Sequence, residues 1–208
     1  MKQVKITLFT AATLAIHIVS AGAQNVPAVP KSSQPALVTS GQIVISGRAT
    51  PYMIRHLPVS SFPALPREVQ DELNKRGCTI PQTYEAHRPE NVVHANFEGR
   101  GASDWALLCA ARGTVSLLVF FNGSAQPPAV LASAPETERL QAHDVSGVLG
   151  FNWGIDPATP QQVAGAQAGL TPHPPTLDHD ALADTIVEHK TIYHFYAKSA
   201  WTLVKLPD

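Results

Sequence analysis

The chain has 208 residues, of which 44% are hydrophobic and 15% are charged, with 18 prolines, two cysteines and a formal net charge of -1. This composition excludes a collagen, a coiled coil, a charged disordered tail and a cysteine-rich miniprotein. Lysine and arginine are scattered along the sequence, which excludes the clustered basic surface that nucleic acid or an anionic membrane requires. The length fits one globular domain with an attached segment.

Residues 1–23 have the pattern of a secretory signal peptide. Lys2 and Lys5 precede an uncharged, mostly apolar stretch over residues 6–20, and small residues follow at the cleavage positions. The alternative is a membrane anchor, which requires about 20 strongly apolar residues, whereas polar side chains interrupt this stretch. We therefore predict a periplasmic or secreted protein that begins at Gln24 after cleavage and retains no membrane span.

Prolines set the predicted domain boundaries. Seven of the 18 fall before residue 67. Residues 24–53 are therefore predicted to form a flexible proline-rich segment, and residues 54–208 to form one domain. Within the first segment, the weak alternation over residues 42–46 is compatible with a short edge strand. Regular hydrogen-bonded structure is expected in the proline-free stretches 90–126 and 176–206, because proline removes a backbone donor.

The first predicted element of the domain is a helix over residues 66–76. Leu65, Val69 and Leu73 are spaced four residues apart, so they fall on one face of a helix. Gly77 follows at the position where glycine commonly ends a helix. The pattern predicts a short amphipathic helix that packs against the rest of the domain.

Three runs of strand-forming residues come next, at residues 91–97, 104–110 and 114–121. Short turns join them, which is typical of a three-stranded antiparallel meander. In the second run, both alternating sets of side chains are apolar. This pattern indicates a central strand that is covered on both faces.

The remaining elements complete the predicted fold class. Further strands are expected at residues 129–132 and 144–155, and a capping box at residues 159–162 predicts a short helix. Residues 179–189 are expected to form a second helix, and residues 191–205 a closing hairpin. Clustered strands with helices at both sides indicate the α+β class. The expected fold is an antiparallel sheet with a central meander, flanking short helices and a C-terminal β-hairpin.

The two cysteines predict a disulfide. Cys78 follows the first predicted helix and Cys109 lies in the central strand, and both would enter an oxidising compartment after export. The alternative is a catalytic or metal-binding thiol, which requires a partner cysteine at close spacing or a nucleophile motif. Neither is present, so the sequence favours one Cys78–Cys109 disulfide.

The turn at residues 96–106 reads N-F-E-G-R-G-A-S-D-W-A. It resembles one unit of the FG-GAP or VCBS repeat, whose turn is D-F-N-G-D-G-x-x-D-L-A. The matching positions are Phe97, Gly99, Gly101, Asp104 and Ala106. That family builds propellers from several copies, whereas this chain has no second copy, so a propeller is not expected. A glycine-rich hairpin loop without any relation to the repeat is the alternative.

The resemblance implies a calcium-binding turn, because the acidic positions of the repeat hold Ca²⁺. Asn96, Glu98 and Asp104 retain side-chain oxygens, but Arg100 occupies a central ligand position. Arginine stays protonated and opposes a cation. We therefore predict that the turn binds no metal and that Arg100 pairs with Glu98 or Asp104.

A second resemblance covers more of the chain. Arg55-His56-Leu57-Pro58 and residues 76–82, 104–109 and 193–201 together resemble a group of uncharacterised bacterial secreted proteins. This resemblance implies export, and it implies no activity.

Familiar catalytic signatures are absent from the sequence. There is no G-x-S-x-G, no H-E-x-x-H, no phosphate-binding P-loop and no dinucleotide-binding glycine motif. Seven titratable residues gather around the helix predicted at residues 179–189: His173, Asp178, His179, Asp180, Asp184, Glu188 and His189. They could form a metal site, but the solvated polar face of an amphipathic helix explains them with nothing added, and we favour that interpretation. No catalytic residue, metal ligand or cofactor is predicted.

These observations favour an exported, disulfide-stapled, non-catalytic protein that binds a protein or a cell-envelope component. An inhibitor of a secreted hydrolase is a close variant of this hypothesis. The alternative is an enzyme with an unfamiliar site, for which the His/Asp cluster around residues 178–189 is the candidate. A cleft with perturbed carboxylates and histidines would favour catalysis.

Overall fold

The computed structural model describes residues 36–207, and the predicted signal peptide and the new terminus at Gln24 lie outside the described residues. Thirteen strands in two sheets make up nearly half of this part of the chain. Sheet A contains β1 (Leu37–Ile45), β2 (Arg48–Pro58), β3 (Thr79–Gln82), β4 (Val92–Ala95), β5 (Asp104–Ala111), β6 (Thr114–Phe120), β7 (Ala129–Pro135), β8 (Leu140–Ala142) and β9 (Leu149–Phe151). Sheet B contains β10 (Trp153–Ala158), β11 (Ala181–Ile186), β12 (Lys190–Ala197) and β13 (Ala200–Leu203).

The fold is β-rich, so the α+β prediction was wrong. Among the described residues the α-helices are α1 (Arg67–Arg76) and α2 (Pro160–Ala166). Of the three short 3₁₀ turns, one lies between β2 and α1 and two lie between strands. The helix expected over residues 179–189 is instead β11 and the turn that follows it. Its charged residues have a helix-like spacing, but pairing with β10 on one side and β12 on the other fixes the segment as a strand.

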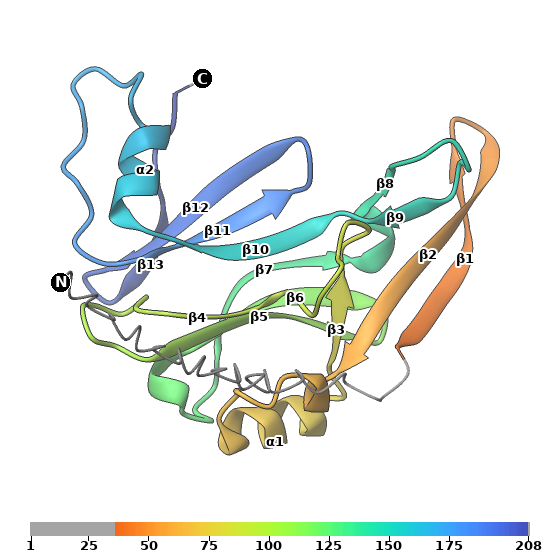
Figure 1. The fold of residues 1–208 in the computed structure, drawn as a ribbon, viewed down its shortest axis with the longest axis horizontal. Helices are drawn as coiled ribbons and strands as arrows, with labels where there is room; N and C mark the ends of the chain where they lie inside the picture. Colours follow the sequence, from red (N-terminus) through yellow and green to blue (C-terminus); the bar gives the residue numbers. More distant parts are fainter. Residues whose placement is uncertain (1–35, 208) are drawn as a thin grey trace, which may run out of the picture. The chain divides into compact units, whose positions relative to one another are not determined.

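Sheet A runs in the order β7-β6-β5-β3-β2-β9-β8, with β1 paired to β2 and β4 paired to β5 (Figure 1). The predicted meander is confirmed, because β4, β5 and β6 pair antiparallel. Within residues 36–207, the strand pairs of the sheet are antiparallel apart from β2 with β9. Strand β2 therefore links the meander to the second half of the sheet.

Strand β5 lies at the centre of two apolar cores, which confirms the prediction of a strand covered on both faces. Trp105 and Leu107 pack toward α1 in one core, whereas Ala106 and Leu108 pack in the other core with residues of sheet B, among them Trp153. Figure 1 shows α1 below the meander and sheet B above it. The described part of the chain is thus layered as helix, sheet and sheet.

The chain passes from sheet A to sheet B at Asn152, between β9 and β10. The Asn152 amide donates to the Arg139 carbonyl at 2.9 Å, and the Asn152 carbonyl accepts from the Val187 amide at 2.9 Å. The amide and the carbonyl of Asn152 therefore bond to two different segments, one just before β8 and one just after β11. The single strand expected over residues 144–155 is consequently two strands that belong to different sheets.

Several local predictions are confirmed. Helix α1 ends at Gly77, which has a φ of 72°, and Val69 and Leu73 are fully buried. Helix α2 begins with the expected capping box between Thr159 and Gln162. The closing hairpin is formed by β12 and β13. No helix within residues 36–207 is long and apolar enough to span a membrane.

The proline-rich segment contains more structure than its composition indicates. Residues 37–53 of the predicted flexible segment form β1 and the first half of β2, and the predicted domain boundary at residue 53 falls inside β2. A two-residue turn at Ser46 and Gly47, both with positive φ, joins the two strands. This is the type I′ turn that matches the twist of an antiparallel hairpin.

Candidate functional site

The FG-GAP-like turn is held together by Asp104. This aspartate is fully buried, and its two carboxylate oxygens accept hydrogen bonds from the amides of Glu98 at 2.7 Å and Asn122 at 2.8 Å. The Asn122 side chain in turn donates to the Glu98 carboxylate at 2.8 Å. The acidic groups of the turn therefore serve to close it.

Arg100 does not contact Glu98 or Asp104 as expected. Its Nε donates to the Asp178 carbonyl at 2.8 Å, so it joins the turn to the segment before β11. Asn96 makes a second link, because its amide and its side chain both donate to the Asp180 carboxylate at 3.2 Å. No group of three or more histidine, cysteine or acidic side chains within residues 36–207 is placed to hold a metal ion.

The predicted His/Asp cluster is dispersed because its segment is a strand. Asp184 points into the core, where Trp153 Nε1 donates to it at 2.6 Å and His194 Nε2 lies 3.1 Å away. His179 bonds to its neighbour Asp178 at 2.7 Å, which lowers the pKa of the Asp178 carboxyl. The structure does not bring these groups to one site.

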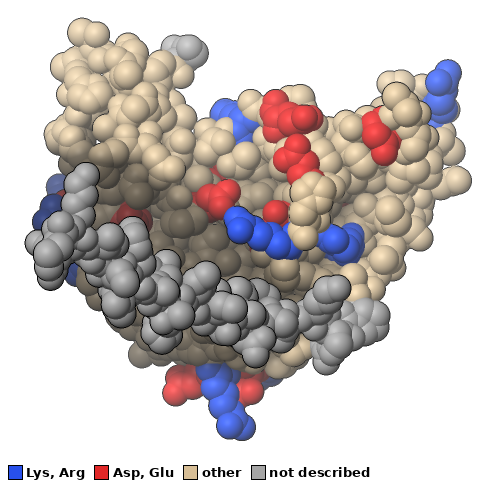
Figure 2. Space-filling model, viewed as in Figure 1, with Lys and Arg blue, Asp and Glu red and all other residues tan. Residues whose placement is uncertain are grey.

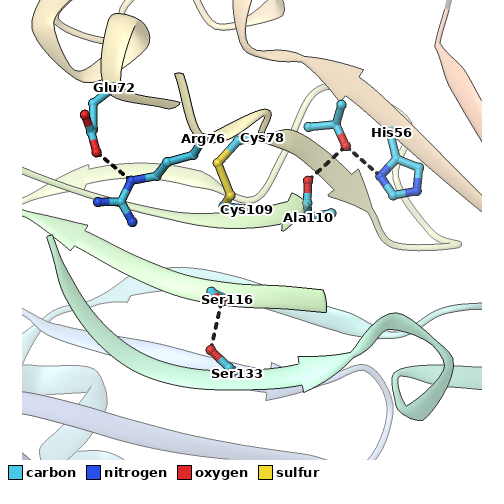
Figure 3. The surroundings of a disulfide bond; sticks show 9 residues. His56, Glu72, Arg76, Cys78, Cys109, Ala110, Ser116 and Ser133 are labelled. Atoms are coloured by element: carbon cyan, nitrogen blue, oxygen red, sulfur yellow. Dashed lines mark hydrogen bonds and ion pairs between the residues drawn. A yellow bond between two sulfur atoms is a disulfide. The ribbon is translucent and has the colours of Figure 1, made fainter. Parts of the chain in front are cut away.

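The disulfide between Cys78 and Cys109 is confirmed. It joins the residue after Gly77 to the central strand β5 (Figure 3). The next residues along each chain segment, Thr79 and Ala110, are paired in register between β3 and β5. The disulfide therefore fixes the position of β3 against β5 in the middle of sheet A.

A cavity of about 290 Å³ lies beside the Cys78–Cys109 disulfide. His56 of β2 and Glu136 line it, both more than nine-tenths buried, with His56 Nε2 and Glu136 Oε1 4.0 Å apart. On its other side, His56 Nδ1 bonds to the Thr79 hydroxyl at 3.2 Å (Figure 3). His56 Nε2 has no hydrogen-bond partner within the described part of the chain.

Burial perturbs both titratable groups of this cavity. Loss of hydration lowers the pKa of His56 and raises the pKa of Glu136, because a buried site disfavours the charged form of each. Both groups are thereby displaced toward their neutral states. Sequence analysis missed this pair, since the two residues are brought together only by the pairing of distant segments.

A second cavity, of about 380 Å³, is lined by the carboxylates of Glu85, Glu90, Asp156 and Glu188. Burial, together with the neighbouring Glu90, raises the pKa of Asp156. Tyr84 donates to Glu188 at 3.0 Å, and burial with this bond raises the pKa of Tyr84 to about 12. Figure 2 shows acidic and basic side chains side by side near the middle of the face in view.

The most exposed structural element is β1, at the edge of sheet A. Within residues 36–207 it pairs with β2 alone, in an unbroken register from Leu37 opposite His56 to Ile45 opposite Arg48 (Figure 1). Its sequence, LVTSGQIVI, contains no charge and no proline. Natural edge strands are usually protected by charges, prolines or bulges, and β1 has none of these.

The hairpin geometry determines which backbone groups of β1 are free. A two-residue type I′ turn is closed by a hydrogen-bonded pair, here Ile45 with Arg48. Pairs alternate along an antiparallel ladder, so the odd-numbered residues of β1 direct their N–H and C=O groups toward β2. The even-numbered residues direct theirs away from the sheet; these are Val38, Ser40, Gln42 and Val44.

The sequence indicated a short edge strand over residues 42–46 but not its full length from Leu37 to Ile45, because the prolines near it outweighed the strand signal. The signal was present: a β-branched run ends at Ile45, the Ser46-Gly47 turn follows, and a second run of strand-forming residues begins at Arg48. A scan of protein-family models finds no match to this chain, and comparisons with curated proteins and with solved structures find none either. The proposed function therefore rests on the geometry of the described residues.

Proposed function

We propose that this is an exported, disulfide-stabilised, non-catalytic protein that acts in the periplasm or the medium by binding another protein. The β1 edge is the binding surface, and it accepts an extended segment of the partner as an additional strand. A single observation carries this proposal: β1 is nine residues long and uncharged, and no strand formed by residues 36–207 pairs with its outer edge.

Strand addition uses two kinds of interaction, and β1 offers both. Main-chain hydrogen bonds supply affinity, while side chains on alternate faces supply specificity. The four even-numbered residues of β1 provide the outward N–H and C=O groups. Val38 and Val44 are 57% and 75% exposed, so a partner strand would also cover apolar surface.

The rest of the fold provides a fixed support for this edge. Strand β2 pairs with β1 on one side and with β3 and β9 on the other, and the disulfide ties β3's segment to β5. A partner therefore adds to a preformed sheet, which lowers the entropic cost of binding. An envelope protein and a secreted hydrolase are the partner classes that this proposal covers.

Gln42 allows a direct test of strand addition. Its amide points outward, so Gln42→Pro removes a donor to the partner without removing a β1–β2 hydrogen bond. Peptides selected by display on the immobilised protein should bind Gln42→Pro at least about tenfold more weakly. Gln42→Ala retains the amide and should bind them like the natural protein. Equal binding by the proline variant, with an unchanged melting temperature, would contradict the proposal.

The His56–Glu136 cavity favours a second candidate function, acid–base catalysis. It holds a histidine and a carboxyl group with oppositely shifted pKa values, a combination found in catalytic sites. The test is turnover of a panel of ester, peptide and glycoside substrates by the natural protein and by His56→Ala and Glu136→Gln. Catalysis requires a turnover that both variants lose while they remain folded. Absence of turnover across the panel rejects this candidate for these reaction classes.

A further inference from the structure

The exposed apolar side chains of β1 are arranged symmetrically about its central residue, Gly41. Leu37 and Val38 lie at one end of the strand and Val44 and Ile45 at the other, and each is at least 45% exposed. Between them, Thr39, Ser40, Gly41 and Gln42 are small or polar, and Ile43 is half-buried. We propose that β1 pairs antiparallel with β1 of a second copy of the chain, about a two-fold axis at Gly41. This inference rests on the proposed function, because it names a first occupant of the same edge.

The hydrogen-bond pattern agrees with this register. Antiparallel pairing about Gly41 sets Val38 opposite Val44 of the second copy, and Ser40 opposite Gln42 of the second copy. All four of these residues have outward-pointing backbone groups, so each such pair exchanges two hydrogen bonds. Shifting the partner by one residue would set outward groups against residues whose groups already face β2.

The side chains agree with it as well. On one face Val38 meets Val44 of the second copy, and on the other face Leu37 meets Ile45 of the second copy. Apolar residues thus cover apolar residues at both ends, while Ser40 and Gln42 pair in the middle. Because the strand carries no charge, no like charges are brought together. Cross-strand pairs of this kind stabilise a sheet, and the interface is isologous, as two-fold symmetry requires.

Gly41 suits the position of the two-fold axis. The Tyr52 side chain of β2 lies against this glycine, so close that an added Cβ would meet its ring at 2.9 Å. The backbone of β1 is therefore covered by an aromatic ring on the core-side face and has no side chain of its own there. Two such strands can approach without a side-chain clash at the centre of the interface.

Sedimentation of the purified protein over a range of concentrations tests the association. We expect a reversible dimer whose dissociation constant changes little with salt. Val44→Lys should raise that constant at least about tenfold, because the symmetry places the substitution in two Val38–Val44 pairs of the interface. The matched control is Val130→Lys, since Val130 is 56% exposed on β7 at another edge of sheet A. The control should leave the dimer unchanged.

Disulfide trapping tests the register. Thr39 lies opposite Ile43 of the second copy in a non-hydrogen-bonded pair, where Cα atoms are about 4.5 Å apart, within reach of a disulfide. Thr39→Cys and Ile43→Cys should each stay uncrosslinked alone, and their equimolar mixture should form a crosslinked dimer under oxidising conditions. Thr39→Cys mixed with Ile45→Cys is the register control and should not crosslink.

The outcomes separate this inference from the proposed function. A protein that sediments as a monomer at all concentrations, yet binds displayed peptides through Gln42, overturns self-pairing and leaves strand addition intact. A monomer that binds no peptide overturns both. A dimer that Val130→Lys disrupts and Val44→Lys does not would place the interface at β7 and overturn the inference.

Discussion

Strands β5 and β1 belong to the same sheet but have opposite surroundings. From Asp104 to Ala110 every residue of β5 is buried, with one apolar core on each face and a disulfide at Cys109. Most residues of β1 are exposed, and within residues 36–207 the strand has β2 as its one partner. Both strands are uncharged apart from Asp104 at the start of β5.

This contrast shows that an apolar strand has different roles in different places. In β5 the apolar side chains are buried in the two cores, so they contribute to the stability of the fold. In β1 the apolar side chains face solvent, so another strand can bind by covering them. Substitutions in the two strands test how far the stabilising role of β5 is separate from the binding role of β1.

Removal of the disulfide is expected to have the largest effect. Replacing both Cys78 and Cys109 by alanine releases a constraint across 31 residues and should lower the free energy of unfolding by about 2 to 5 kcal/mol. Chemical denaturation measures this loss. Because β1 is held by its hydrogen-bonded ladder with β2 and not by the disulfide itself, peptide binding below the new melting temperature should persist. Unchanged stability would show that the staple does not hold the centre of sheet A.

Leu108→Ala and Val44→Ala compare the two strands directly. Leu108 is fully buried in β5, so its truncation should lower the free energy of unfolding by about 3 kcal/mol. Val44 is 75% exposed in β1, and its truncation should change the stability of the monomer by about 0.5 kcal/mol or less. Thermal unfolding at low protein concentration measures both. Similar losses for the two variants would refute the division of roles.

Glu136→Gln should change stability in a pH-dependent way. Burial raises the pKa of Glu136 in the folded protein, so the folded state is favoured while this carboxyl is protonated. That stability is complete below the unfolded pKa of 4.5 and is lost as pH rises through the folded value. Glutamine has no charge to bury, so the variant should be more stable than the natural protein at neutral pH and gain nothing below pH 4.5. The exposed neighbour Glu138→Gln is the control and should show neither change.

The smallest expected effect concerns calcium. The resemblance of the Asn96 to Ala106 turn to an FG-GAP repeat stays a prediction, and so does its lack of metal binding. Arg100 contacts the Asp178 carbonyl, and Asp104 is occupied by two amides, so calorimetry with millimolar Ca²⁺ should show no binding. Arg100→Asp restores a ligand oxygen and should bind Ca²⁺ weakly. A clear isotherm for the natural protein would contradict this reading of Arg100.

The sequence predicted those elements whose signals are local. Leu65, Val69 and Leu73 with the terminal Gly77 indicate α1, and the Thr159 capping box indicates α2. The meander followed from three β-rich runs joined by short turns, and the disulfide from a count of two cysteines. Each of these signals lies within a few residues or needs no geometry at all.

Features that depend on distant pairing escaped prediction. Residues 179–189 have a helix-like spacing of acidic groups, and only the neighbouring strands β10 and β12 make them a strand. His56 and Glu136 lie 80 residues apart in sequence and share a cavity because of the sheet order. The β1 edge is a property of the whole sheet, since a strand is at an edge only when no other segment pairs with it.

Residue-resolved amide hydrogen exchange of β1 tests the central claim most directly. In dilute protein, the amides of Thr39, Gly41 and Ile43 should be protected by β2, while those of Ser40 and Gln42 should exchange rapidly. Addition of a selected peptide, or of more protein, should then protect Ser40 and Gln42 and leave the other three unchanged. Protection of Ser40 and Gln42 already in the dilute protein, or its absence in the complex, would contradict the account of β1 as a free edge that binds by strand addition.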